Sequence, residues 1–450
     1  MNNSLSTRLL EERLPRYTSY PTAPHFSEAV SSESYQSWLA SIPGETSASL
    51  YVHVPFCRSM CWYCGCHTKI TRLDEPIENY LTTLSREINL VADQLIEHPI
   101  IRHLHFGGGT PTIMSPQAFL ELVTHLRQRF SFADNAELAI EIDPRTLSRE
   151  MTSALAVAGI TRASLGIQSL DPVVQRAVNR VQDFDLIAQV TEDLRAADIR
   201  SLNFDLIYGL PLQTEASCID TARQCIALQP ERFAVFGYAH VPSFKKHQRK
   251  IDEAALAGSA GRLAQADAIA KTLVNAGYQR IGFDHFALPG DAISSAQRAG
   301  RLHRNFQGYT DDCSNTLIGF GASAIGRFQQ GYVQNEVSVP RYAARVTNGE
   351  IATARGYELT AEDRLRADII ERLMCDLRID LSGIGRRHAM TADRLLEMAP
   401  RLNELANEHL VQIEGSVITI PESARLLIRT IASTFDAYLS ASNNTYSSAV

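Results

Sequence analysis

The sequence has no long apolar run, no low-complexity tract and no excess of basic residues. Its longest apolar stretches, such as 154–160, are much shorter than the roughly 18 residues that a membrane-spanning helix needs. The first fifteen residues, MNNSLSTRLLEERLP, mix charges with single leucines and lack the apolar core of a secretory signal. We therefore expect no membrane span and a cytoplasmic location.

The chain also lacks the charge balance of a nucleic-acid-binding protein. Acidic residues outnumber basic ones, 50 to 43, and the formal net charge is −7. Because nucleic-acid phosphates attract basic surfaces, this balance argues against a nucleic-acid partner. Hydrophobic residues make up 45% and charged residues 21%, which excludes a disordered or fibrous chain. A length of 450 residues predicts more than one domain, and we expect a monomer.

Cysteine is scarce, but its distribution is uneven. Of the eight cysteines, four are scattered and the other four fall within ten residues. The clustered residues are Cys57, Cys61, Cys64 and Cys66. In a reducing compartment, such a group is more typical of a metal or catalytic site than of a disulfide framework.

Short β-rich runs alternate with stretches that have apolar residues at helical spacing. The β-rich runs cover 49–56, 101–109, 137–143, 162–169, 201–210 and 232–240. The helical stretches between them cover 77–97, 116–130, 147–158, 184–197 and 215–228. Repeated β-α units favour parallel strands joined by helical crossovers. The pattern predicts an α/β fold, a partial (βα)6 barrel of the TIM type.

The β-rich runs are apolar on one face and polar on the other, near their carboxyl ends. Glu141 and Asp143 alternate with isoleucines, and Asn203 and Asp205 alternate with Phe204 and a leucine. Since the carboxyl ends of parallel strands meet at one edge, these polar groups predict a site there.

The ends of the chain have a different character. Three helical segments, 361–376, 391–408 and 422–440, surround a predicted β-hairpin at 410–420, a pattern that resembles a winged helix. Few Lys or Arg cluster there, so we expect a cap over the substrate and not a DNA-binding domain. The proline-rich start predicts an extended arm. The expected division is an arm at 1–31, a barrel at 32–360 and a cap at 361–450.

The cysteine group supports three interpretations. Three thiols at C-x3-C-x2-C spacing can hold a cubane iron–sulfur cluster and leave one iron open to another ligand. Four thiols in one loop could instead hold zinc, although zinc sites usually use two well-separated pairs. A redox pair of Cys61 and Cys64 would leave Cys57 and Cys66 without a role.

The cysteine spacing, followed by the glycine-rich run 107–109, resembles the radical S-adenosylmethionine (SAM) superfamily. A longer set of motifs is similar to the oxygen-independent coproporphyrinogen III oxidase family. These motifs are RYTSYPTA, YVHVPFC, CGC, LHFGGGTPT, EIDP, GIQSLD, NFDLIYGLP, GYAHVP and LHRNFQGYT. The resemblance covers nearly the whole chain, from Arg16 to RLLIR near the C-terminus.

This resemblance implies a set of site residues. Cys57, Cys61 and Cys64 would bind a [4Fe-4S] cluster whose fourth iron is chelated by SAM. The matching contacts to the first SAM are Tyr51, Gly108, Gly109, Glu141 and Ile325. The matching contacts to a second SAM are Tyr63, Gly109, Thr110, Gln168, Arg180, Asp205 and Ala239. Read without the resemblance, Tyr51 would be a core residue and Glu141 a carboxylate paired with Arg162. Cys66 is a further candidate for a catalytic role.

The resemblance also implies a reaction. Two propionates of coproporphyrinogen III would become vinyl groups with loss of CO2, giving protoporphyrinogen IX in heme biosynthesis, with electrons from a donor. Candidates to bind the substrate carboxylates are Arg16, Lys245, Lys246, His303 and Arg304. The alternatives are another radical SAM reaction on a tetrapyrrole, a heme-binding trafficking protein on the same scaffold, and a zinc-stabilised regulator.

Overall fold

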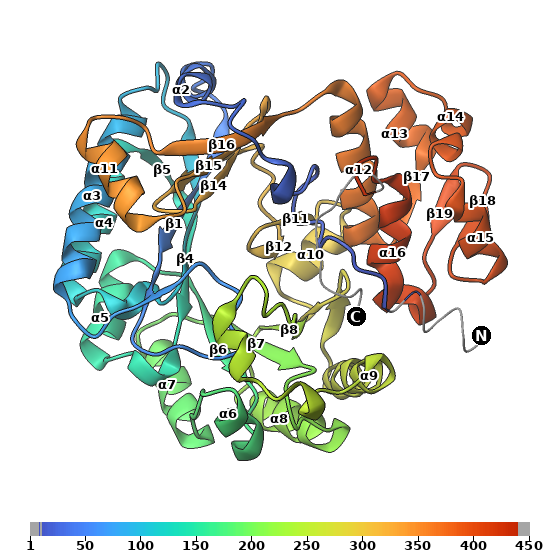
Figure 1. Cartoon of the computed structure of the whole chain (residues 1–450), viewed down its shortest axis with the longest axis horizontal. Coiled ribbons are helices and arrows are strands. Elements are labelled where there is room, and N and C mark those ends of the chain that lie inside the picture. The colour runs from blue at the N-terminus through green and yellow to red at the C-terminus, as the bar shows by residue number, and fades with distance from the viewer. Residues whose placement is uncertain (1–8, 10, 440–450) are drawn as a thin grey trace.

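Six parallel strands form the centre of one curved sheet (Figure 1). The computed structural model describes residue 9 and residues 11–439. The parallel strands are β1 (Ser47–Val54), β4 (Ile100–Gly108), β5 (Ser131–Ile142), β6 (Arg162–Gln168), β7 (Ser201–Tyr208) and β8 (Arg232–Gly237). They lie side by side in chain order, so the predicted partial (βα)6 barrel is confirmed.

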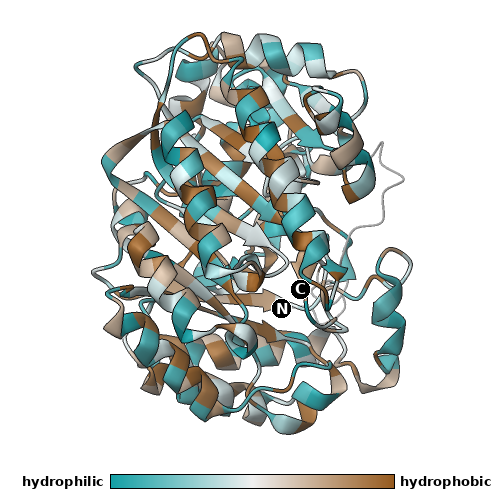
Figure 2. Cartoon of the chain, turned by 90° about the vertical axis from the view of Figure 1, so that its left-hand side faces the viewer, coloured by the Kyte–Doolittle hydropathy of each residue, from teal (hydrophilic) through white to brown (hydrophobic). Residues whose placement is uncertain are grey.

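Helices cover the outer face of this sheet. They are α3 (Glu75–Ala92), α4 (Pro116–Arg129), α5 (Arg149–Ala158), α6 (Pro172–Ala177), α7 (Phe184–Ala196), α8 (Glu215–Ala227) and α9 (Ser259–Asn275). Local signals set their ends: Thr214 forms a capping box at the start of α8, and Gly159, with φ of +79°, ends α5. In β6 and β7 alternate side chains are buried, and Figure 2 shows strands rich in apolar residues behind helices that mix polar and apolar residues.

The sheet continues at both edges, giving twelve strands among the described residues. Beyond β1 lie β13 (Thr316–Phe320), β14 (Ile325–Arg327), β15 (Gly331–Asn335) and β16 (Thr353–Glu358); beyond β8 lie β10 (His285–Ala287) and β9 (Gln279–Ile281). Two small ribbons pair β2 (Phe56–Cys57) with β3 (Lys69–Ile70) and β11 (His303–Asn305) with β12 (Gly308–Thr310). Helices α2 (Ser32–Ala40), α10 (Ala292–Arg298) and α11 (Val339–Thr347) complete this part.

The C-terminal elements form a separate group on the right of Figure 1. They are α12 (Ala361–Asp376), β17 (Arg378–Asp380), α13 (Leu381–His388), α14 (Ala392–Glu397), α15 (Arg401–Asn407), β18 (Gln412–Glu414), β19 (Val417–Thr419) and α16 (Ile428–Ala432). The predicted hairpin is confirmed as β18–β19, which β17 extends to three strands. One continuous helix over 391–408 was wrong: the chain breaks there, and Pro400 caps α15 because proline fits a helix start and not its interior. The segment 422–440 is α16 between two 3-10 turns, and its last residue lies outside the described residues.

Residues 11–31 are mostly irregular and run between the barrel and the C-terminal group (Figure 1). The Arg429 side chain from α16 donates a hydrogen bond to the Pro15 carbonyl at 2.9 Å, and the Tyr17 hydroxyl donates to Asp436 at 3.0 Å. The division at 31/32 and 360/361 stays a prediction. Within the described part of the chain, no helix has the length and apolar character to cross a membrane.

Candidate active site at the carboxyl ends of the strands

A cavity of about 780 Å³ opens where the parallel strands end. Most of the residues singled out in the sequence line it: Cys57, Cys61, Tyr63, Cys64, Cys66, Gly108, Gly109, Thr110, Glu141, Gln168, Arg180, Asp205 and Ala239. Tyr51 and Ile325 are not among the lining residues. The Tyr51 hydroxyl lies 3.0 Å from Nδ1 of His53, and Ile325 begins β14.

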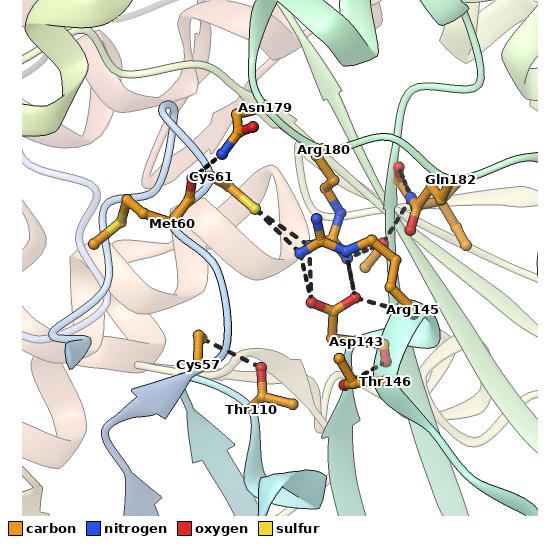
Figure 3. A network of polar contacts seen from close by, with 12 residues as sticks. Cys57, Met60, Cys61, Thr110, Asp143, Arg145, Thr146, Asn179, Arg180 and Gln182 are labelled. Atoms are coloured by element: carbon orange, nitrogen blue, oxygen red, sulfur yellow. Dashed lines mark hydrogen bonds and ion pairs between the residues drawn. The ribbon is translucent and has the colours of Figure 1, made fainter. Parts of the chain in front are cut away.

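Cys57 ends β2, and Cys61, Cys64 and Cys66 lie on the irregular loop that follows, residues 58–68. Cys57 is half-buried, with Sγ 3.2 Å from Oγ1 of Thr110 (Figure 3). Cys61 is buried beside two guanidinium groups, Cys64 is half-buried and Cys66 is exposed. The loop is anchored by its backbone, since the Trp62 N–H donates to the Val178 carbonyl at 2.9 Å. Four thiols without disulfides therefore surround one end of the cavity.

The thiols differ in acidity. Burial raises the pKa of Cys57 to about 12. A hydrogen bond from the Cys66 thiol, helped by nearby His247 and Lys245, lowers the pKa of Cys64 to about 6. In the described residues, no three Cys, His, Asp or Glu side chains converge on one point as a single metal ion requires. The ligands of a cubane bind separate irons and need no such convergence.

An ion-pair network reaches the buried cysteine. The Asp143 carboxylate accepts hydrogen bonds from Arg145 at 2.7 and 2.9 Å and forms an ion pair with Arg180 at 3.3 Å (Figure 3). Arg145 and Arg180 each donate to Sγ of Cys61, at 3.4 and 3.5 Å. Arg180 also donates to the Gly166 carbonyl at 2.5 Å, while its buried Nε has no partner. The sequence interpretation placed Asp143 on the polar face but did not include Asp143 or Arg145 in the site.

A second carboxylate lies under the glycine-rich turn. Glu141 accepts a hydrogen bond from the Gly108 N–H at 3.1 Å, and its other oxygen lies 3.4 Å from Nε2 of His105. Burial opposes ionisation of Glu141, but these two partners outweigh it and lower its pKa. Gly108 has φ of +117°, which favours glycine, and a Cβ there would lie 2.8 Å from the His53 ring. The alternative pairing of Glu141 with Arg162 is not found, because Arg162 pairs with Glu137 at 2.6 Å.

Asp205 lies deeper in the cavity wall, between Ser164 and Asn203. Their side chains donate to it at 3.0 and 2.8 Å. Burial, reinforced by the nearby Glu141 charge, raises the pKa of Asp205 to about 7. Gln168 has φ of +67°, a left-handed conformation that turns the end of β6 toward the cavity.

Basic side chains also line the cavity, and we call them its basic wall. Of the five candidates for substrate carboxylates, Arg16, Lys245 and Arg304 line it. Lys246 and His303 do not, and His303 contacts Glu371 at 3.1 Å. Arg304 is buried, with two of its nitrogens lacking hydrogen-bond partners. Arg16 reaches the cavity from the N-terminal arm and donates to the Gly237 carbonyl at 3.2 Å.

The comparisons with known proteins agree with this geometry. The model of the radical SAM superfamily matches residues 51–225. A relative from Bradyrhizobium diazoefficiens, named oxygen-independent coproporphyrinogen III oxidase, is 53% identical over 450 residues, the whole of both chains. A relative of the same name from Paracoccus denitrificans is 41% identical over 430 residues, covering 96% of this chain and 95% of its own.

The chain belongs to the oxygen-independent coproporphyrinogen III oxidase family. A solved structure points the same way: the coproporphyrinogen III oxidase of Escherichia coli, described as a radical SAM enzyme, matches with a TM-score of 0.90. That match has 38% sequence identity and covers 95% of this chain and 100% of the other.

The family implies a [4Fe-4S] cluster and SAM, and the residues present fit both. Free thiols at the family spacing open into the cavity, which suits a cluster with thiolate ligands. The glycine-rich turn packs closely against β2, since a Cβ on Gly109 would lie 2.5 Å from the Phe56 carbonyl, and Gly108 and Gly109 line the cavity without side chains that would fill it. The unpartnered Nε of Arg180 and the ionised Glu141 supply charges for the carboxylate and amino groups of an amino-acid ligand.

Proposed function

We propose that this chain converts coproporphyrinogen III to protoporphyrinogen IX without oxygen, by oxidative decarboxylation of two propionates, in heme biosynthesis. The observation that carries the proposal is the shared cavity: the cysteine loop and the basic wall of Arg16, Lys245 and Arg304 open into one space. A tetracarboxylate substrate needs the basic wall, and a radical reaction needs the loop nearby. A cytoplasmic location and a monomeric chain accompany the proposal as predictions.

We assign Cys57, Cys61 and Cys64 as the cluster ligands. When bound, the cluster and SAM supply a 5′-deoxyadenosyl radical able to remove a hydrogen atom from a propionate side chain. Arg145 and Arg180 both donate to Sγ of Cys61 and would hold this side chain in position. Cys66 would keep its hydrogen-bond contact with Cys64 and stays a candidate for a catalytic role.

The remaining polar residues would orient SAM. Glu141, ionised and fixed by the Gly108 N–H, faces the position of an amino or hydroxyl group. The family motifs assign Tyr51 and Ile325 to the same molecule, although neither lines the cavity. A second SAM is part of the proposal. It would contact Arg180 and Asp205, together with Tyr63, Gly109, Thr110, Gln168 and Ala239, all of which line the cavity.

The basic wall would fix the substrate. Arg304 has two buried nitrogens without hydrogen-bond partners, although its Nη1 lies 3.6 Å from the Asp284 carboxylate, and Arg16 lines the cavity from the N-terminal arm. Guanidinium groups bind carboxylates through paired hydrogen bonds, so the two arginines suit propionates. Holding the propionates there would orient the tetrapyrrole relative to the cysteine loop and exclude water from part of the cavity.

Anaerobic turnover tests the proposal. Reconstituted enzyme is mixed with coproporphyrinogen III, SAM and dithionite, and CO2 and the vinyl product are measured. We expect about one CO2 per propionate lost and formation of protoporphyrinogen IX. Stable heme binding without turnover by a cluster-loaded enzyme would overturn the proposal in favour of the trafficking alternative.

A further inference from the structure

The basic run KKHQRK contains two candidates for substrate binding, Lys245 and Lys246. It also contacts the cysteine loop. Residues 241–250, called here the basic clamp, follow β8 and lie against the cysteine loop. Lys245 and Val241 face the cavity, whereas Lys246, Arg249 and Lys250 are exposed to solvent. The clamp therefore has one side toward the cavity and one side toward the outside.

The clamp holds the cysteine loop through its backbone. His247 Nε2 lies 2.7 Å from the Cys64 carbonyl oxygen, and the Lys245 ammonium donates to the Cys66 carbonyl at 3.0 Å. Gln248 donates to the Tyr63 carbonyl at 3.0 Å. The carbonyl of the proposed cluster ligand Cys64 and those of Tyr63 and Cys66 are thus all bonded to the clamp.

The outer side of the clamp is strongly positive on an acidic protein. Residues 241–250 contain four Lys or Arg and no acidic residue, although the whole chain carries a net charge of −7. Lys246, Arg249 and Lys250 form no ion pair with a described carboxylate; Lys250 instead lies over the Trp62 ring, 5.6 Å from its centroid. Phe244, beside them, is 66% exposed. Unpaired cations close in sequence to the exposed Phe244 ring are typical of a surface that binds an acidic protein partner.

We infer that the basic clamp is the docking surface for a small acidic one-electron carrier protein that reduces the cluster. The inference rests on the proposed function, which requires an electron donor. In the transfer the carrier loses one electron and the cluster gains it, and no atom moves. Electrostatic steering gives fast, salt-sensitive encounters between such proteins, and small interfaces suit their rapid release. The clamp's hydrogen bonds to residues 63–66 connect this surface directly to the backbone of the proposed ligand Cys64.

A charge-reversal variant tests the docking surface. Lys246→Glu/Arg249→Glu changes two exposed side chains that neither line the cavity nor contact the cysteine loop. The matched control, Arg102→Glu/Arg223→Glu, reverses two exposed charges at the start of β4 and on α8. The probes are a flavodoxin and a [2Fe–2S] ferredoxin, both acidic, added to the cluster-loaded enzymes without oxygen.

We expect at least one carrier to bind the wild-type enzyme and the control equally, with affinity that falls as salt rises. The clamp variant should bind that carrier at least about tenfold more weakly, and the carrier should reduce its cluster correspondingly more slowly. Reduction by dithionite should be the same in all three proteins. Equal carrier binding by wild type and clamp variant would overturn the inference. So would failure of both carriers to bind wild type, or binding of a single-stranded oligonucleotide to the clamp in their place.

Dithionite-driven turnover separates the two proposals. Suppose that wild-type enzyme releases CO2 from coproporphyrinogen III with dithionite, and that wild type and clamp variant bind the carrier equally. Only the docking inference then fails. If no turnover occurs with dithionite, the proposed function fails whatever the carriers do.

Discussion

Two buried polar groups on opposite sides of the barrel wall show how a structural site differs from a binding site. On the outer side, Glu87 of α3 is fully buried and accepts hydrogen bonds from the Gly321 N–H, Asn335 and Tyr342 at 2.5–2.7 Å. On the cavity side, Asp143 and Arg180 are also mostly buried, but Arg180 keeps an unpartnered Nε. The Glu87 group is complete, whereas the Arg180 group has donor capacity left for a ligand.

The fully hydrogen-bonded Glu87 carboxylate holds several elements of the fold together. It ties α3 to β15, α11 and the turn after β13, and the neighbouring Tyr80 hydroxyl donates to the His53 carbonyl at 2.7 Å. It therefore supports the end of β1 from behind. The cavity-side group instead joins the cysteine loop to β6, because Arg180 donates to both Sγ of Cys61 and the Gly166 carbonyl. Burial alone does not separate the two; unused hydrogen-bonding capacity does.

The largest effect expected on the cavity side comes from Cys57→Ala. Removing one of three proposed ligands should abolish cluster binding and SAM cleavage, because the other two thiols cannot hold the cubane. Iron content, visible absorbance and SAM cleavage measure this. Cys313→Ala, an exposed cysteine outside the cavity, is the control and should keep all three. A fully loaded Cys57→Ala protein would contradict the ligand assignment.

On the outer side, Glu87→Ala should mainly reduce stability. It leaves three buried donors without an acceptor, which should lower the free energy of unfolding by about 3 kcal/mol. Denaturant unfolding measures the loss. Because the group does not touch the cavity, the protein that remains folded should keep its SAM affinity. If Glu87→Ala had normal stability and weakened SAM affinity, the structural role assigned to Glu87 would be contradicted.

Asp143→Asn should weaken SAM binding and change stability little, which is the reverse of the effect expected for Glu87→Ala. Loss of the charge releases Arg145 and Arg180 from their shared carboxylate, so both guanidinium groups lose their fixed positions. We expect SAM affinity to fall about tenfold, the size of one charge-assisted hydrogen bond, with a small change in stability. Isothermal titration of cluster-loaded protein gives the affinity. Asp376→Asn, in the pair with Arg372 on α12, is a matched control because neither residue lines the cavity.

The smallest effect concerns pH. Burial raises the pKa of Glu87 to about 7 from an ordinary value of 4.5, so the folded state favours its protonated form. Its contribution to stability is therefore full at low pH and is lost as the pH rises through 7. Glu87→Gln, which cannot ionise, should show a flatter dependence of Tm on pH between about 5 and 8. An unchanged slope would show that Glu87 is ionised throughout this range.

Local patterns predicted the barrel and the cysteine loop. Each β-α unit carries its own apolar periodicity and capping residues, and the C-x3-C-x2-C spacing is contained in eight residues. Glu87 was missed, although it falls in line with Leu84 and Val91 on the buried face of α3. A charged residue in an apolar stripe was the available signal.

Other parts of the site depend on strand register and long-range packing. His105 meets Glu141 only because β4 pairs with β5 so that His105 lies opposite Ala139. Nothing near His105 in the sequence indicates that pairing. Arg145 was overlooked for a similar reason: its contact with Cys61 joins residues 84 positions apart. The break at Pro400 was local and was visible in the sequence as a proline within a helical pattern.

The hydrogen bonds that hold the cysteine loop also set an order of events during protein synthesis. Residue 57 leaves the ribosome early, but the loop gains its backbone partner Val178 and its carbonyl donors Lys245, His247 and Gln248 much later. A nascent chain that ends before residue 248 presents its thiols on an unsupported loop. Machinery that delivers the cluster thus meets the finished binding conformation only after more than half of the chain has been translated.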